Sequence, residues 1–230
     1  MPLSRKRERA GVRAGKKHFA MTLDPLLIDL PMPIVTPRLT IQPIQPGDGA
    51  AVHAAKMESW DDLARWSIWT FKPKNDTTEQ DDELLCHRFH RQFVSREKIP
   101  LLAFNRKDGV LVGQGSLSNC DWTNRIFCLG YWVRTGCAGQ GFATEIGSAL
   151  CTYAFREMKA FRLTSFHAEG NDASRRVLEK LGFEQEGIFR NHHFLGTQAV
   201  NEYHYGLLDP ARLPDVQTSW DGNATPVRPA

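Results

Sequence analysis

The sequence predicts an α/β fold in which helices flank a mixed, mostly antiparallel sheet. Leu101 to Arg106 and Val110 to Leu117 are apolar runs on either side of Lys107-Asp108-Gly109, and Asp-Gly between such runs is a strong hairpin signal. Ile126 to Val133 follows after a polar turn and completes an antiparallel meander. A predicted helix separates this strand from the next one, Phe161 to Ala168, so these two strands should run parallel. The expected sheet therefore has one parallel pair near its centre.

A strand and two helices are expected ahead of the meander. Arg38 to Ile44 alternates between apolar and polar residues as a half-buried strand does, and Ala50 to Met57 has a helical composition. Glu79 to Lys98 predicts a second helix with an apolar stripe, started by a threonine cap and ended by Pro100. The segment between the two helices, residues 58–76, is less regular.

The second half of the chain predicts a helix, a strand, a short helix and a hairpin. The first helix has one apolar face at three- and four-residue spacing, made by Ile146, Ala149, Leu150 and Tyr153. Asn171-Asp172 has side chains that begin a helix, and Gly182 fits the left-handed position that ends one. Gly187 to Leu195 and Val200 to Leu208 flank Gly196-Thr197 and predict the last hairpin.

The two ends of the chain differ in composition from the middle. The formal charge of +3 arises in the first 20 residues, which hold seven Lys or Arg and one Glu, so residues 21–230 are net negative. We expect residues 1–35 to be a basic, disordered extension and lead-in, residues 36–209 one domain, and residues 210–230 a disordered tail. The extension could bind RNA or the ribosome through phosphates, or be upstream sequence ahead of a start at Met21. No apolar run approaches the roughly 18 residues of a membrane-spanning helix.

A glycine turn precedes the helix that follows the meander. Gly139 and Gly141 remove side chains where the first helical turn begins, so the unpaired N–H groups of Gly139 to Ala143 can meet an anion at contact distance. This arrangement predicts a place for a phosphate or pyrophosphate. The same spacing also fits an ordinary tight connection into a helix. It lacks the third glycine of a dinucleotide-binding turn, so other motifs have to decide.

Cysteines and histidines give weaker signals. The five cysteines include no C-x-x-C pair, which favours a reduced cytoplasmic compartment over a disulfide framework. Cys137 borders the glycine turn, but no spacing motif supports a nucleophile there. His87 and His90 lie three apart on a predicted helix with no third ligand placed beside them, so we expect surface positions and predict no metal site.

Tryptophans gather in the irregular segment between the first two helices. Trp60, Trp66 and Trp69 fall within ten positions, and Phe71 is close behind. Large aromatic side chains most often seal a core, and this is the interpretation we favour. The alternative is that the cluster lines the mouth of a substrate site.

Several short motifs follow one another in a fixed order along the chain. They are Thr36-Pro-Arg-Leu39, Gly130-Tyr-Trp-Val133, Gly139-Gln-Gly141 with Thr144-Glu145, Asn171-Asp-Ala-Ser174, Leu178-Glu-Lys-Leu-Gly-Phe183 and the ending Arg190 … Gly196 … Tyr205-Gly-Leu-Leu208. Together they resemble the GNAT superfamily of acetyl-CoA-dependent N-acetyltransferases, and within it the RimJ/RimL-like group, over residues 36–208. Ala138 departs from the family pattern, which has Gln or Arg at the start of its pyrophosphate loop. Binding should survive, because most of the phosphate contact comes from main-chain N–H groups.

The resemblance implies a cofactor site and a catalytic residue. The strand ending at Val133 would splay from its parallel neighbour, and the pantetheine arm of acetyl-CoA would pair with main-chain groups of Tyr131, Trp132 and Val133. Asn171 would hold the same region through its amide, and Ser174 would protonate the departing thiolate or orient a water molecule that does. Both are also good first-turn residues of a helix. The pyrophosphate would lie on Gly139, Gln140, Gly141, Phe142, Ala143 and Thr144.

The resemblance also implies an enzyme that moves an acetyl group from acetyl-CoA to a primary amine by direct attack, without a metal. A protein N-terminus, ribosomal or otherwise, is the preferred acceptor, and a polyamine, aminoglycoside or amino-acid analogue is the alternative. A non-catalytic acyl-CoA- or RNA-binding module would have the same fold. The base that takes the proton of the amine is left open among Glu169, His167, His193 and Glu202. A homodimer is left open as well.

Overall fold

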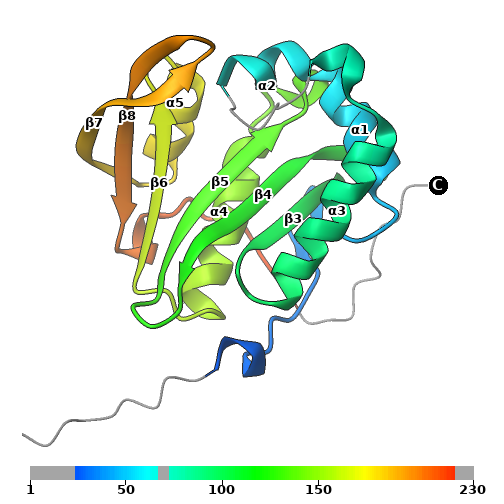
Figure 1. Ribbon diagram of the computed structural model, residues 1–230. Helices are drawn as coiled ribbons and strands as arrows, with labels where there is room; N and C mark the ends of the chain where they lie inside the picture. The colour runs from blue at the N-terminus through cyan, green and yellow to red at the C-terminus, as the bar shows by residue number, and fades with distance from the viewer. Residues whose placement is uncertain (1–23, 67–72, 221–230) are drawn as a thin grey trace, which may run out of the picture.

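The computed structural model describes residues 24–66 and 73–220, and an eight-stranded sheet forms its centre (Figure 1). The strands lie in the order β1-β2-β3-β4-β5-β6-β8-β7. Neighbouring strands are antiparallel except β5 and β6, which are parallel. The predicted mixed sheet with a central parallel pair is thereby confirmed. The strands are β1 (Ile34–Val35), β2 (Leu39–Pro43), β3 (Ile99–Asn105), β4 (Leu111–Asp121), β5 (Ile126–Val133), β6 (Arg162–Ala168), β7 (Glu184–Leu195) and β8 (Gln198–Leu207).

The helices cover the two faces of the sheet unequally. They are α1 (Gly49–Glu58), α2 (Trp60–Trp66), α3 (Glu79–Val94), α4 (Phe142–Arg156) and α5 (Asp172–Lys180). In Figure 1, α1 and α3 lie in front of β3 and β4, whereas α4 and α5 lie behind the sheet. Among residues 24–66 and 73–220, no helix lies in front of β5, β6 and β8, and we call this uncovered surface the open face. None of the helices within the described residues is long and apolar enough to cross a membrane.

Helix α4 packs closely behind the meander. Its apolar face joins the main core, in which Ile146, Leu150 and Tyr153 are fully buried. Gly115 on β4 makes this contact close, because a Cβ atom there would lie 2.7 Å from the Leu150 side chain and 2.8 Å from that of Ile146. The meander and the helix thus form one rigid support for the segment that joins β5 to α4.

Helix boundaries follow the predicted caps in most cases. Thr78 caps α3 in a reciprocal capping box with Asp81. Helix α3 ends at Val94 and not at Lys98, because the chain turns through a left-handed Arg96 (φ 62°). The expected helix stop Pro100 lies inside β3, where it pairs with Ser116.

The expected disordered tail is ordered over its first part. Residues 210–220 pack against the domain: Ser148 Oγ donates to the Pro214 carbonyl at 3.1 Å, Ser219 pairs with Val35, and Trp220 contacts Tyr153 edge-on. At the N-terminal end of the described chain, the lead-in of residues 24–35 contains a single helical turn and the edge strand β1. Residues 1–23, which hold the basic extension, and residues 221–230 lie outside the described part of the chain.

Candidate active site

The parallel strands β5 and β6 separate after a short stretch of pairing. Only Ile126, Phe127 and Cys128 of β5 have partners on β6. Beyond them, β5 stays paired with β4 as far as Val133, while β6 stays paired with β8 as far as Ala168. The predicted splay is therefore present as a gap that widens toward the ends of both strands.

The gap exposes main-chain groups of alternate β5 residues. Arg134 N donates to the Val112 carbonyl of β4 at 2.8 Å. Because successive strand residues direct their main-chain groups to opposite sides, Trp132 also faces β4, and Tyr131 and Val133 face the gap. Leu129 fits this alternation, since its carbonyl accepts a hydrogen bond from Ser165 Oγ of β6 at 2.9 Å. Of the three residues whose main chain was predicted to bind the cofactor, Tyr131, Trp132 and Val133, only Tyr131 and Val133 thus face the gap.

Trp132, between these two residues, has its side chain on the side of the sheet that α1 and α3 cover. The indole packs against the apolar cluster under α1 and α3, and its Nε1 donates to Gln114 Oε1 at 3.2 Å. The expected main-chain contribution of Trp132 is directed to β4 instead of the gap.

The glycine turn lies at the end of β5 and leads into α4. Gly139 (φ 73°) and Gly141 (φ 82°) are both left-handed, which is the conformation that glycine adopts without strain. Gly141 is the N-cap of α4, and no side chain caps this helix. Within the described residues, the main-chain N–H groups of Gly139, Gln140 and Gly141 donate to no protein acceptor. Unpaired N–H groups at a helix N-terminus form an anion site.

An arginine from the start of the domain holds this turn. Arg38 Nη1 donates to the Gln140 carbonyl at 2.9 Å, and its Nε donates to Glu145 Oε2 at 2.6 Å. Glu145 is buried in the first turn of α4 and also accepts from Thr36 Oγ1 at 2.6 Å. The guanidinium lies over the Phe142 ring, 4.2 Å from its centroid. Arg38 and Glu145 belong to separate sequence motifs, and neither was predicted to have a role at the site.

The segment between β5 and the glycine turn is held from the other side by α1 and α2. Arg134 Nε donates to Glu58 Oε2 at 2.7 Å, and Glu58 Oε1 accepts from Gly136 N at 3.0 Å. The Arg134 guanidinium is the main reason why the pKa of Glu58 lies below its usual range. Thr135 Oγ1 donates to Asp62 Oδ2 at 2.6 Å. Two independent sets of contacts thus fix the glycine turn and the segment before it.

Tyr131 and Ser174 meet behind the gap. The Tyr131 hydroxyl lies 3.1 Å from Ser174 Oγ and 3.3 Å from the Ser174 carbonyl oxygen. Burial raises the pKa of Tyr131, so its hydroxyl stays protonated at neutral pH and can donate. Asn171 caps α5, its Oδ1 accepting from Ser174 N at 3.1 Å. The structure therefore brings together two of the predicted site residues and shows the capping role for the third.

The four candidate bases lie in three different settings. His167 is buried, its Nδ1 lies 2.9 Å from the Ala168 carbonyl, and its Nε2 lies 3.2 Å from the Tyr205 hydroxyl. Glu169 is exposed and accepts from Asn201 N at 3.2 Å. His193 and Glu202 lie together on the β7–β8 hairpin, with Nδ1 and Oε2 3.4 Å apart. His193 and Glu202 lie on the open face. Glu202 pairs with Ala168 at the end of β6, and directly paired residues of neighbouring strands point to the same face of the sheet.

The two tryptophans of the cluster that the structure describes differ in burial. Trp60 is buried, as predicted for a core residue. Trp66 is half-buried, and its ring lies close to Gly170, where a Cβ atom would be 3.8 Å from the indole. Helix α2 thus reaches the turn that begins α5, next to the open end of the gap. Trp69 and Phe71 lie outside the described residues.

Comparison with known proteins assigns the fold to a family. A family profile described as "Acetyltransferase (GNAT) domain" matches residues 38–184. The chain belongs to the GNAT acetyltransferases. This chain is 30% identical over 174 residues to the "Putative ribosomal N-acetyltransferase YdaF" of Bacillus subtilis. The aligned region covers 76% of this chain and 93% of the relative.

Solved structures agree with this assignment. One of them is Mycobacterium smegmatis RimJ in complex with CoA-disulfide. It superposes on this chain with a TM-score of 0.70 at 21% identity, and the superposition covers 80% of this chain and 90% of that one. RimL, a ribosomal L7/L12 alpha-N-protein acetyltransferase whose structure is in complex with coenzyme A, gives a TM-score of 0.70 at 19% identity over 77% of this chain and 97% of that one. At these identities the likeness shows the fold. The predicted RimJ/RimL-like membership and the predicted enzyme class, an acetyltransferase, are confirmed.

Proposed function

We propose that this GNAT acetyltransferase moves the acetyl group of acetyl-CoA to the amine at a protein N-terminus. The observation that carries the proposal is the gap between β5 and β6, which opens beside the glycine turn. The free main-chain groups of Tyr131 and Val133 can pair with an extended, amide-containing chain. The N–H groups of Gly139 to Thr144 can bind a diphosphate. Acetyl-CoA has both parts, since its amide-containing arm is joined to a diphosphate.

The reaction needs one proton removed and one supplied. The neutral amine nitrogen attacks the thioester carbon, and an N–H group facing the gap stabilises the negative charge on the carbonyl oxygen. The tetrahedral intermediate then releases the thiolate as the C–S bond breaks. Ser174 gives a proton to this thiolate and takes one back from water, and the Tyr131 hydroxyl, within hydrogen-bonding distance of Ser174 Oγ, orients it. The proton of the amine leaves to water or to a group on the open face.

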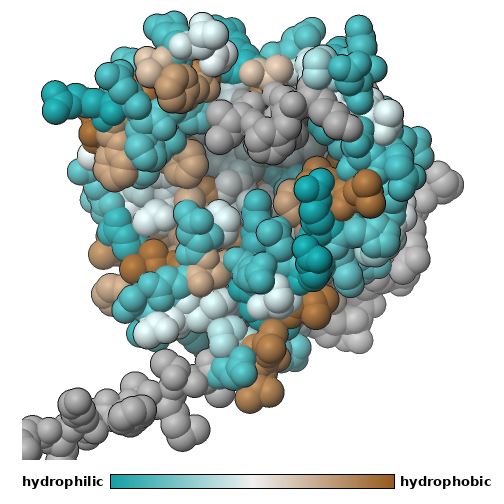
Figure 2. All heavy atoms as spheres, in the orientation of Figure 1, coloured by the Kyte–Doolittle hydropathy of each residue, from teal (hydrophilic) through white to brown (hydrophobic). Residues whose placement is uncertain are grey.

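The open face supports a peptide as the acceptor. Phe166 of β6 and Phe189 of β7 are 43% and 49% exposed, and Figure 2 shows brown, apolar residues at the upper left of the molecule, where β7 and β8 lie in Figure 1. An uncovered surface with apolar side chains suits an extended peptide better than a small polycation, which would call for a narrow acidic pocket. The names of the relatives point to the same acceptor class, because YdaF is called a ribosomal N-acetyltransferase and RimL a ribosomal L7/L12 alpha-N-protein acetyltransferase.

The compartment and the assembly complete the proposal. All five cysteines are free, which supports a reducing, cytoplasmic setting. Contact with RNA or the ribosome through residues 1–20 stays a prediction, because these residues lie outside the described part of the chain. A homodimer stays a prediction as well.

The test is calorimetric titration of acetyl-CoA into the full-length chain, followed by thiol-release assays. Peptides that begin with ribosomal-protein N-termini are compared with the same peptides blocked at the α-amine, and with polyamines, aminoglycosides and free amino acids. We expect micromolar binding and turnover that needs the free α-amine. Turnover on small amines alone would replace the peptide acceptor by the small-molecule one. A failure to bind millimolar acetyl-CoA would overturn the enzymatic assignment of the site.

A further inference from the structure

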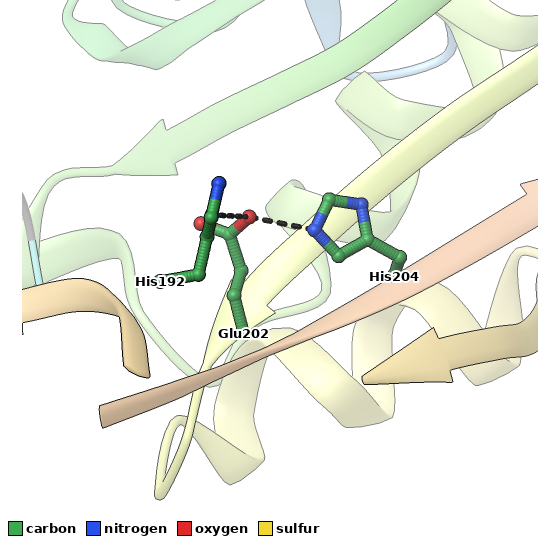
Figure 3. Close-up of side chains that lie close together, drawn as sticks. All are labelled: His192, Glu202 and His204. Carbon is green, nitrogen blue, oxygen red and sulfur yellow. Dashed lines mark hydrogen bonds and ion pairs between the residues drawn. The ribbon is translucent and has the colours of Figure 1, made fainter. Parts of the chain in front are cut away.

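A second group of reactive side chains lies on the open face of the sheet. Glu202 of β8 is 5% exposed, and its Oε1 lies 3.1 Å from His192 Nδ1 and 2.7 Å from His204 Nε2. Figure 3 shows the carboxylate between the two imidazoles. Glu202 is one of the four candidate bases of the acetyl-transfer site, whereas that site gives His192 and His204 no role.

The hairpin itself brings the three residues together. Glu202 and His204 are two positions apart on β8, so their side chains point to the same face. His192 comes from β7, where the register shifts between Phe189 and His193. Such a bulge redirects a side chain from the regular alternation of its strand. The sequence alone does not reveal this meeting, because His192 is separated from the other two by the hairpin turn.

We propose that His192, Glu202 and His204 form a binding site for a zinc ion. The three ligand atoms, one from each residue, lie within 4.8 Å of one another. Zinc binds histidine nitrogen and carboxylate oxygen at about 2.0–2.2 Å, so that ligand atoms in a tetrahedral site are roughly 3.4 Å apart. Small rotations of the exposed His192 and the half-buried His204 bring the cluster to this spacing.

The contacts of His204 fit a metal ligand better than a hydrogen-bond donor. Its Nε2 lies 2.7 Å from Glu202 Oε1, yet the two groups are not aligned for a hydrogen bond, and this buried nitrogen has no hydrogen-bond partner within the described residues. A histidine nitrogen and a carboxylate oxygen that lie this close without a hydrogen bond between them can share a cation as ligands. A buried atom of this kind is costly if it is left unpaired.

The charge of Glu202 also calls for a cation. Its ion-pair partners within the described residues are three histidines, His192, His193 and His204, and no Lys or Arg is among them. A buried carboxylate is costly unless it is paired or binds a metal. Zinc supplies the positive charge while the imidazoles stay neutral, as metal ligation requires.

Neighbouring side chains hold the ligands in place. The Phe189 ring stacks on His204 with centroids 3.9 Å apart and meets His192 edge-on at 5.2 Å. His193 Nδ1 lies 3.4 Å from Glu202 Oε2, the carboxylate oxygen that faces away from the proposed ion. Groups that orient metal ligands in this way are typical of real metal sites. The exposed side of His192 leaves a fourth position for water.

The experiment uses the untagged full-length chain after treatment with a chelator. Zn²⁺ is titrated by calorimetry, with Mg²⁺ and Ca²⁺ as hard cations that prefer oxygen ligands, and Co²⁺ is added to record the visible absorption of a four-coordinate ion. We expect one Zn²⁺ per chain at micromolar or tighter Kd, a raised Tm, and no response to Mg²⁺ or Ca²⁺. The outcome does not depend on whether the chain transfers acetyl groups.

Variants separate this site from adventitious binding. His192→Ala removes an exposed ligand with little effect on folding, and Glu202→Gln keeps the shape but removes the charge; each should weaken Zn²⁺ binding by at least ~10-fold. His87→Ala is the matched control, because His87 is an exposed histidine paired with Glu83 on α3. The proposal is overturned if Zn²⁺ does not bind below millimolar concentration, or if His192→Ala and His87→Ala bind it alike. The Tm of each metal-free variant shows whether it is folded.

Discussion

Arg38 joins Glu145, 107 positions further along the chain, to the glycine turn. Its Nε donates to Glu145 Oε2 at 2.6 Å, while its Nη1 donates to the Gln140 carbonyl at 2.9 Å. Ala138 occupies the position where related loops have a long polar side chain, and it can make no such contact. We infer that Arg38 supplies this contact from another segment and keeps the N–H groups of the turn directed at the anion site.

Replacing Arg38 by Ala should therefore weaken acetyl-CoA binding. The change frees the Gln140 carbonyl and leaves the buried Glu145 without its cation, which we expect to cost about 1–2 kcal/mol of stability. The Kd for acetyl-CoA, measured by calorimetry, should rise about tenfold, equivalent to about 1.4 kcal/mol. The kcat at saturating acetyl-CoA should change little, because Arg38 does not lie beside Tyr131 or Ser174.

The matched control for Arg38 is Arg212→Ala. Arg212 is equally exposed, 45% against 43%, and it also pairs with a glutamate, Glu184, but near the end of the sheet that is far from the turn. It should bind acetyl-CoA like the wild type. Equal losses in the two variants would show that Arg38 acts only through general stability or net charge.

Gly139→Ala tests whether the turn itself contacts the anion. Gly139 (φ 73°) is left-handed and a Cβ atom there would meet nothing within 4 Å, so the protein can accommodate alanine apart from about 1–2 kcal/mol of backbone strain. Gly196 (φ 61°), in the β7–β8 turn, has the same conformation and the same free space. We expect Gly139→Ala to weaken acetyl-CoA binding by tenfold or more, because the new methyl group occupies the phosphate position.

Gly196→Ala carries the same strain without that contact, so its Kd for acetyl-CoA should stay within about twofold of the wild type once both proteins are shown to be folded by their Tm. If the two variants bind equally well, the glycine turn is an ordinary connection into α4 and the phosphate assignment fails.

Sequence reasoning was most successful where the signal is local. The Asp-Gly turn, the Thr78 and Asn171 caps and the left-handed Gly182 (φ 80°) each depend on a few neighbouring residues, and the structure has all of them. It failed where distant segments decide the outcome. Residues 210–220 are rich in proline and polar residues, yet Trp220 has an apolar neighbour in Tyr153 that no local pattern could reveal.

The site shows the same division. The family motifs identified Tyr131 and Ser174 separately, and their hydroxyl contact could be found only in the folded chain. The Arg38–Glu145 contact and the Glu202 cluster depend on β-sheet register and on a bulge. Neither has a periodic signature in the sequence.

Direct attack predicts that no cysteine carries the acetyl group. Burial raises the pKa of Cys86 and Cys120 to about 12, and partial burial raises that of Cys137 as well. A raised pKa keeps the thiol protonated at neutral pH, and the reactive thiolate gains population only as the pH approaches that value. Cys137→Ser should keep kcat/KM within about twofold, and intact-mass spectra with acetyl-CoA alone should show no acetylated protein. An acetyl adduct lost in Cys137→Ser would establish a covalent route instead.

Ser174→Ala is the sharpest test of the proposed chemistry, because Ser174 reaches the site without supporting the fold. Helix α5 is capped by Asn171, whose side chain accepts from the Ser174 main-chain N–H, so alanine at 174 leaves the cap in place. If Ser174 protonates the thiolate, kcat should fall about 100-fold while the Kd for acetyl-CoA stays nearly constant. Tyr131→Phe, which removes the hydroxyl 3.1 Å from Ser174 Oγ, should lower kcat by a smaller factor and add little to the loss in the double variant.

Asn171→Ala is the control for the helix cap. It should lose about 1 kcal/mol of stability with the cap, while its kcat falls much less than that of Ser174→Ala. A Ser174→Ala enzyme with wild-type kcat would mean that water protonates the leaving group and that the Tyr131–Ser174 contact only joins α5 to β5.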